Sequence, residues 1–152
     1  MDVFSKSKRS EVMSRIRGRG NRSTERAMAA LLRTQRITGW RRHPTRVFGR
    51  PDFYFPRLRA AVFLDGCFWH ACRCCFKMPA RNRLFWEEKI RRNRSRDRLV
   101  DRTLNASGIR VLRLWEHDLE RRTPRLSYLL SVLRASGARE AVTASGRPGH
   151  GG

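Results

Sequence analysis

The fold is decided by residues 49–66, which read GRPDFYFPRLRAAVFLDG. Residues 52–55 form a short aromatic segment, and residues 60–64 are continuously apolar, as a strand covered on both faces should be. The connection between them, residues 56–59, has the length of a hairpin turn. We therefore predict two neighbouring strands, with Asp52 opening the first and Asp65 closing the second.

The segments around this pair alternate between helical and extended patterns. Apolar residues at steps of three and four predict helices, and short apolar runs predict strands. The order of these segments predicts an α/β fold with a mixed central β-sheet flanked by helices on both faces. The expected elements are a short helix at 10–17, a helix capped by Ser23 or Thr24, an edge strand at 39–43, a long helix at 82–107 ended by Gly108, a strand at 109–115, and a last helix from Thr123 and Pro124.

Length and composition suggest one folded domain between two less regular ends. The chain has 152 residues, which is enough for one hydrophobic core. We expect a basic N-terminal segment at 1–22, a folded domain at 23–135, and a disordered, glycine-rich tail at 136–152. Apolar runs are too short for a membrane span, and the N-terminus lacks the apolar stretch of a signal peptide.

The net charge points to a polyanionic partner. The chain carries 35 Lys+Arg against 13 Asp+Glu, a formal charge of +22, and 31 of the basic residues are Arg. Guanidinium groups match phosphate oxygens in pairs, so nucleic acid is the leading partner class. A membrane surface fits less well, because no helix opposes basic residues to a clean apolar face.

All four cysteines lie within nine residues, at Cys67, Cys72, Cys74 and Cys75. A disulfide scaffold would spread its cysteines along the chain, so this cluster indicates a metal site. Three thiolates need a fourth ligand to close a tetrahedral zinc site, and His117 is a better candidate than His70. The alternative is a set of free buried thiols.

Two carboxylates are the candidates for a catalytic metal. A hairpin of this length could bring Asp52 and Asp65 together at one end of the sheet. Carboxylates with a backbone carbonyl suit Mg²⁺, which also binds phosphate oxygens and can promote phosphodiester hydrolysis. Each residue has a simpler explanation: Asp52 as a turn cap after proline, and Asp65 as part of an Asp-Gly turn.

Four motifs resemble those of the very-short-patch-repair (Vsr) mismatch endonucleases, of the PD-(D/E)XK restriction-endonuclease-like superfamily. They are Gly49-Arg-Pro-Asp52-Phe, Asp65-Gly-Cys-Phe-Trp-His70, Phe85-Trp-x2-Lys89-Ile-x2-Asn93-x3-Asp97-Arg and Val111-Leu-x2-Trp-Glu116-His117. The resemblance covers about residues 8–135. It implies a restriction-endonuclease-like fold with structural Zn²⁺, and Mg²⁺-dependent nicking of DNA beside the T of a T:G mismatch left by deamination of 5-methylcytosine.

The resemblance also implies catalytic roles. Asp52 matches the catalytic, Mg²⁺-binding Asp, and the main-chain oxygen of Leu64 matches a further Mg²⁺ ligand. His70 matches the catalytic His, which suits proton transfer near neutral pH, and Asp97 matches the carboxylate that orients it. Glu25 matches a helix carboxylate bordering the site. His70 as a zinc ligand or as a plain structural residue remains an alternative.

One further position varies within the family, and another departs from the pattern of the superfamily. Asp65, expected here as a catalytic and Mg²⁺-binding residue, falls where members carry His or Asp. The superfamily's usual Lys is replaced by Cys67, so a His base has to substitute for it. Cys67, Cys72 and His117 match zinc-ligand positions, and either Cys74 or Cys75 supplies the remaining thiolate. We prefer Cys75, because Cys-x2-Cys is the commoner chelate.

For DNA, the resemblance implies contacts from Met13, and aromatic residues that wedge into the base stack beside the mismatch. Phe68 and Trp69 match the wedge, and Trp86 either joins it or is a core residue. Arg-rich segments at 15–26, 41–50 and 91–98 would contact phosphates.

The expected partner is therefore double-stranded DNA containing a T:G mismatch, with general mismatch-repair proteins as a further class. We expect a monomer in the bacterial cytosol, associated with the nucleoid and not with a membrane. Two other functions remain open: a restriction-type nuclease on matched DNA, and a non-catalytic, zinc-dependent DNA-binding module.

Overall fold

The computed structural model describes residues 22–68 and 70–144, and side chains as far as residue 135. The sheet has four strands in the order β1-β2-β3-β4. β1 (Arg41–Arg42), β2 (Phe53–Phe55) and β3 (Ala60–Asp65) pair antiparallel in sequence, whereas β4 (Arg110–Trp115) pairs parallel with β3. This confirms the mixed α/β sheet with flanking helices.

The hairpin predicted from the sequence is present. Phe55 pairs with Ala60 across the turn, and the backbone N–H of Arg59 donates to the carbonyl of Pro56. The parallel pair β3–β4 needs a crossover, which is supplied by α2 (Arg83–Ala106). Gly108 ends that crossover with φ +76° and donates its N–H to the Asn105 carbonyl, as expected for a glycine just past a helix.

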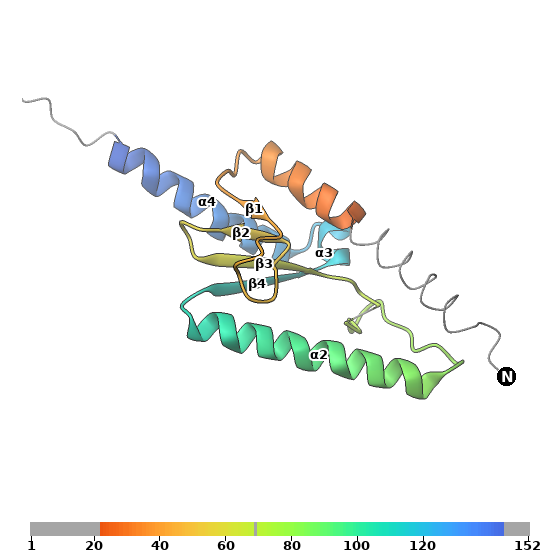
Figure 1. Cartoon of the computed structure of the whole chain (residues 1–152). Helices are drawn as coiled ribbons and strands as arrows, with labels where there is room; N and C mark the ends of the chain where they lie inside the picture. The colour runs from red at the N-terminus through yellow and green to blue at the C-terminus, as the bar shows by residue number, and fades with distance from the viewer. Residues whose placement is uncertain (1–21, 69, 145–152) are drawn as a thin grey trace, which may run out of the picture.

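Helices cover both faces of the sheet (Figure 1). On one face lie the helix of residues 22–34, orange in Figure 1, and α4 (Pro124–Ala144). Their apolar residues pack with alternate residues of the strands in the larger core. Its members include Met28, Leu32, Phe53, Val62, Leu64, Leu112, Leu114, Leu126 and Leu133.

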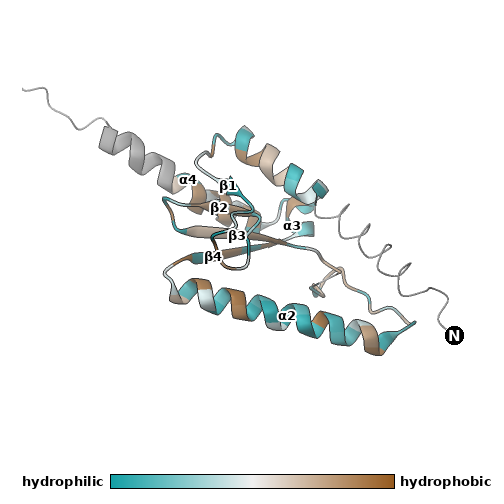
Figure 2. Ribbon diagram, viewed as in Figure 1, coloured by the Kyte–Doolittle hydropathy of each residue, from teal (hydrophilic) through white to brown (hydrophobic). Residues whose placement is uncertain are grey.

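The opposite face is covered by α2, which is mostly polar, whereas β2 and β3 are mostly apolar (Figure 2). A smaller core forms there from Val100 and Leu104 of α2 with Ala61 and Phe63 of β3. Successive strand residues point to opposite faces, so Leu64 faces the larger core and Asp65 falls on the α2 side. This alternation decides which residues can share a site.

Three boundaries differ from the sequence prediction. Ser23 and Thr24 lie inside the helix of residues 22–34 and so do not cap it. A short helix, α3 (Glu116–Arg121), was not predicted; Asp118 caps it by accepting from the Trp115 N–H at 2.8 Å. α4 continues past residue 136, where we expected the disordered tail to begin, because most of the tail's glycines lie beyond its end at Ala144.

The predicted helix at 10–17 and most of the segment 1–22 lie outside the described residues. Within the described part, every helix is too short or too polar to cross a bilayer.

Candidate active site

The first group of ionisable side chains joins the helix of residues 22–34 to the start of β2. It contains Glu25, His43 and Asp52, whose ligand atoms all lie within 4.8 Å of one another. Gly49 lets the chain reach this position: its φ is +79°, and a Cβ there would meet Val100 Cγ1 of α2 at 2.5 Å. The carboxylate of Asp52 accepts a hydrogen bond from the Leu64 N–H at 2.7 Å, which ties it to β3.

The pKa values of Asp52 and Glu25 are shifted in opposite directions. Burial raises the pKa of Asp52 to about 7, with the negative charge of Glu25 adding to the rise and the Leu64 hydrogen bond opposing it. Burial would also raise the pKa of Glu25, but hydrogen bonds from His43 and Arg42 outweigh it and lower that pKa. These bonds reach the same oxygen, Oε2, at 2.9 Å from His43 Nε2 and 2.6 Å from Arg42 Nη2.

Asp52 is therefore the group in this cluster that would gain from a bound cation. A divalent ion would stabilise its charged form in a site where burial disfavours that form. Oxygen ligands from Asp52 and Glu25 are the donor type that Mg²⁺ prefers, so these residues fit the expected metal. The role of the Leu64 main-chain oxygen stays a prediction.

The second group lies on the α2 side of the sheet and contains Asp65, His70 and Asp97. His70 Nδ1 lies 2.5 Å from Asp97 Oδ2, the pair expected from the sequence. Since a carboxylate accepts, Nδ1 carries the proton, and in the neutral ring Nε2 would hold the lone pair. His70 Nε2 lies 3.9 Å from Asp65 Oδ1.

The two predicted metal-binding acids, Asp52 and Asp65, fall in different groups of ionisable side chains. Asp65 belongs with His70 and Asp97, and Asp52 belongs with Glu25 and His43. Asp65 lies on the α2 side of β3, where Arg113 Nη1 binds it at 2.9 Å. The role of Asp65 as a Mg²⁺ ligand stays a prediction; burial raises the pKa of Asp65, against the opposing charge of Arg113.

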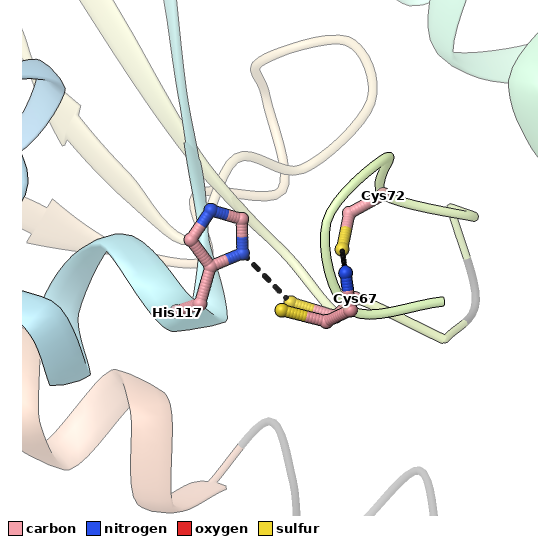
Figure 3. Close-up of side chains that lie close together, drawn as sticks. Cys67, Cys72 and His117 are labelled. Carbon is pink, nitrogen blue, oxygen red and sulfur yellow. Dashed lines mark hydrogen bonds between the residues drawn. The ribbon is translucent and has the colours of Figure 1, made fainter. Parts of the chain in front are cut away.

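The third group is the cysteine cluster in the loop after β3 (Figure 3). The side chains of Cys67, Cys72, Cys75 and His117 bring four ligand atoms within 4.8 Å of one another, which is the set preferred from the sequence. Cys67 Sγ lies 3.2 Å from His117 Nδ1, so the first turn of α3 is held against the loop (Figure 3). His70 is not a member of this group, contrary to the alternative that made it a zinc ligand.

Three sulfurs and one imidazole nitrogen suit Zn²⁺. Burial raises the pKa of Cys67 to about 12, so binding a metal there requires displacement of a firmly held proton. Cys74 is exposed, and its Sγ lies 3.2 Å from that of Cys75 and 3.5 Å from both nitrogens of His117. Cys74 is therefore close enough to compete as a ligand.

Aromatic side chains gather beside the cysteine loop. Phe68 and Trp86 meet edge to face, with ring centroids 5.2 Å apart, and Phe76 lies 5.7 Å from Phe68. Phe68 and Trp86 are both partly exposed, so they keep surface that DNA could contact. Trp69 and Met13 lie outside the described residues, and the wedge remains a prediction.

Two site residues were missed in the sequence. His43 follows the edge strand within an Arg-rich run, and its contact with Glu25 depends on a long-range approach. Arg113 had a visible signal, because it stands between the apolar residues Leu112 and Leu114 in the middle of the strand predicted at 109–115. A charge at such a position needs buried partners, and Arg113 has them in Asp65 and Asp101.

Comparison with known proteins agrees with the motifs. Residues 1–76 match the family model described as DNA mismatch endonuclease Vsr. The chain is 40% identical over 122 residues to the DNA mismatch endonuclease Vsr of Escherichia coli (strain K12), covering 80% of this chain and 77% of that protein.

Two similar proteins are named as nicking enzymes. Type II nicking enzyme V.XorIIP of Xanthomonas oryzae pv. oryzae is 34% identical over 119 residues, covering 78% of this chain and 86% of that enzyme. Type II nicking enzyme V.NaeI of Lentzea aerocolonigenes is 48% identical over 69 residues, covering 45% of this chain and 42% of that enzyme. This last match therefore spans less than half of its relative.

Proposed function

Because the chain belongs to the family of Vsr DNA mismatch endonucleases and is thus a DNA endonuclease, we propose that it nicks one strand of a duplex beside the T of a T:G mismatch, with Mg²⁺ as cofactor. Such a mismatch arises when 5-methylcytosine is deaminated, and the nick would start very short patch repair. The observation that carries the proposal is the hydrogen-bonded His70–Asp97 pair on a chain of charge +22 that also holds the buried carboxylate of Asp52.

The chain's own groups divide the reaction between them. Asp52 and Glu25 would hold Mg²⁺, whose Lewis acidity offsets the charge that builds up on the scissile phosphate. His70 Nε2 accepts the proton of the attacking water, and Asp97 fixes the ring and stabilises the imidazolium through Nδ1–H. The roles of His70 and Asp97 need no lysine, which agrees with Cys67 at the superfamily's lysine position.

Selectivity for the mismatch would come from the aromatic group. Unstacking a base step costs a few kcal/mol, and less at a weakly stacked mismatched pair. The Phe68 and Trp86 rings pack edge to face, and this contact would hold a wedging side chain in place. Arginines such as Arg91 and Arg94, exposed on α2, are suited to phosphate contacts that position the duplex.

We assign a structural role to Zn²⁺ at Cys67, Cys72, Cys75 and His117. Bound there, the ion would link the loop that carries Phe68 and His70 to α3 at the end of β4. It would fix the position of the catalytic imidazole relative to the sheet.

The test uses end-labelled duplexes that differ only in one T:G or one C:G pair, with and without Mg²⁺. We expect one nick in the T-containing strand of the mismatched duplex alone. Asp52→Ala should abolish nicking while DNA binding persists. Double-strand cuts in matched DNA would indicate a restriction-type nuclease instead, and binding without any cleavage would indicate a non-catalytic zinc-dependent module.

A further inference from the structure

Arg113 is a charged residue in the middle of β4, and its side chain is only 20% exposed. It lies on the α2 side of the sheet, where its guanidinium carbon sits 4.5 Å from the centroid of the Phe63 ring. Neither the sequence motifs nor the catalytic roles described above include it. A buried guanidinium is costly unless carboxylates surround it, so its partners show what it is there to hold.

Three carboxylates from two elements surround this guanidinium. Nη1 lies 2.9 Å from Asp65 Oδ1 of β3. On the other side, Nη2 lies 2.6 Å and Nε 3.0 Å from Asp101 Oδ1 of α2, which anchors the fork to the helix. One turn earlier on α2, Asp97 Oδ1 lies 3.9 Å from Nη2.

Two of these carboxylates are the ones that flank His70. Asp97 uses Oδ2 for His70 Nδ1 and turns Oδ1 towards Arg113. Asp65, bound to Nη1, lies 3.9 Å from His70 Nε2. Without a cation between them, the two carboxylates would repel each other and compete for the imidazole.

We propose that Arg113 is a positioning residue for the nicking reaction. Its guanidinium holds Asp65 and Asp97 on opposite sides of the His70 ring, so the ring keeps Nδ1 on Asp97 and leaves Nε2 to receive the proton. This inference rests on the proposed function, since it concerns the base of that reaction. It explains why a guanidinium lies between the buried residues Leu112 and Leu114 of β4.

The geometry requires arginine and not just a positive charge. A guanidinium has several N–H donors in one plane, and Arg113 donates hydrogen bonds to Asp65 and Asp101 at the same time. A lysine ammonium could balance the charge but could not span Asp65 and Asp101 in the same way. Arg113→Lys should therefore lie between the wild type and Arg113→Met.

The experiment measures single-turnover nicking of the T:G duplex, with enzyme in excess, alongside the Kd for DNA. Arg113→Met should slow nicking about 10- to 100-fold, the effect of a base displaced by a fraction of an ångström to an ångström. Its Kd should change less than about twofold, because Arg113 is inside the fold and not at a phosphate. Arg110→Met is the matched control: this exposed residue of the same strand bonds Tyr128, and its rate should stay within about twofold of wild type.

A second readout does not depend on activity. In ¹⁵N histidine NMR of the metal-replete protein without DNA, wild-type His70 should show one tautomer, protonated at Nδ1. Arg113→Met should show exchange between tautomers, whereas Arg110→Met should not. A thermal melting curve shows whether Arg113→Met folds. If it does not, the nicking rate and the His70 tautomer are compared between the wild type and Arg113→Lys.

A wild-type nicking rate or an unchanged His70 tautomer in the folded Arg113 variants would overturn the inference. Loss of DNA affinity equal to the loss of rate would also overturn it, because Arg113 would then serve binding. If the wild type itself does not nick T:G duplexes, the proposed function fails, and the tautomer measurement still decides whether Arg113 positions His70.

Discussion

Replacing Asp52 by Asn should stabilise the Mg²⁺-free protein above neutral pH while abolishing nicking. Asn has nearly the same shape and can still accept the hydrogen bond from the Leu64 N–H. It removes the charge that burial disfavours, and the pKa of Asp52, raised to about 7, reports that cost.

The sign follows from the two proton affinities. The pKa of Asp52 rises from 3.8 in the unfolded chain to about 7 in the folded one, so between these values the folded state keeps a proton that the unfolded state has lost. The stability that Asp52 contributes is therefore lost as the pH rises through that window, and the loss is complete above the folded-state pKa. The full loss is about 4 kcal/mol, of which about 3 kcal/mol falls between pH 5 and pH 8.

The assay is urea unfolding of both proteins between pH 5 and pH 8.5, without added Mg²⁺ and without a chelator that would strip zinc. The free-energy difference between variant and wild type reports Asp52 together with its coupling to Glu25, because the other titratable groups are common to both. Glu87→Gln, an exposed carboxylate on α2, is the control and should leave the pH dependence unchanged. Added Mg²⁺ should stabilise the wild type and not Asp52→Asn.

Parallel stability curves for wild type and Asp52→Asn would refute this reasoning. They would mean that the Asp52 carboxylate is solvated in the folded protein. It would then bind a cation no more strongly than an exposed Asp does.

Three other predictions concern the framework of the site. Gly49→Ala should destabilise the fold by about 2 kcal/mol or more in thermal or urea unfolding, because φ is +79° and the new methyl would meet Val100; an unchanged midpoint would contradict this packing. Cys75→Ser should reduce bound zinc measured by metal analysis, whereas Cys74→Ser should retain close to one ion; the reverse pattern would make Cys74 the ligand. Leu104→Ala should cost about 3 kcal/mol, as Leu104 is 1% exposed in the smaller core, and a loss under about 1 kcal/mol would show that α2 is not held there.

Much of the framework could be predicted from local sequence. The apolar run at 60–64, the glycine after the long helix and the hairpin length each determine a structure within a few residues, and all three are present. The zinc-ligand candidates were predictable for the same reason, since the cysteines are neighbours in the sequence and only His117 had to come from a distance.

Contacts between distant segments could not be predicted from the sequence. Asp65 binds Arg113 of β4 on the α2 side of the sheet. Asp52 meets Glu25, which is far away in the sequence, on the helix of residues 22–34. The hydrophobic pattern of neither segment predicts that Asp52 and Glu25 meet.

The residues available for chemistry were determined by the sequence alone: a strongly basic chain, clustered thiols, and acids at strand ends beside an imidazole. Their grouping was decided by the tertiary structure. Which face of a strand a side chain occupies, and which helix covers that face, depends on packing between distant segments. That packing brings Asp52 to Glu25 and places Arg113 between the two carboxylates that flank His70.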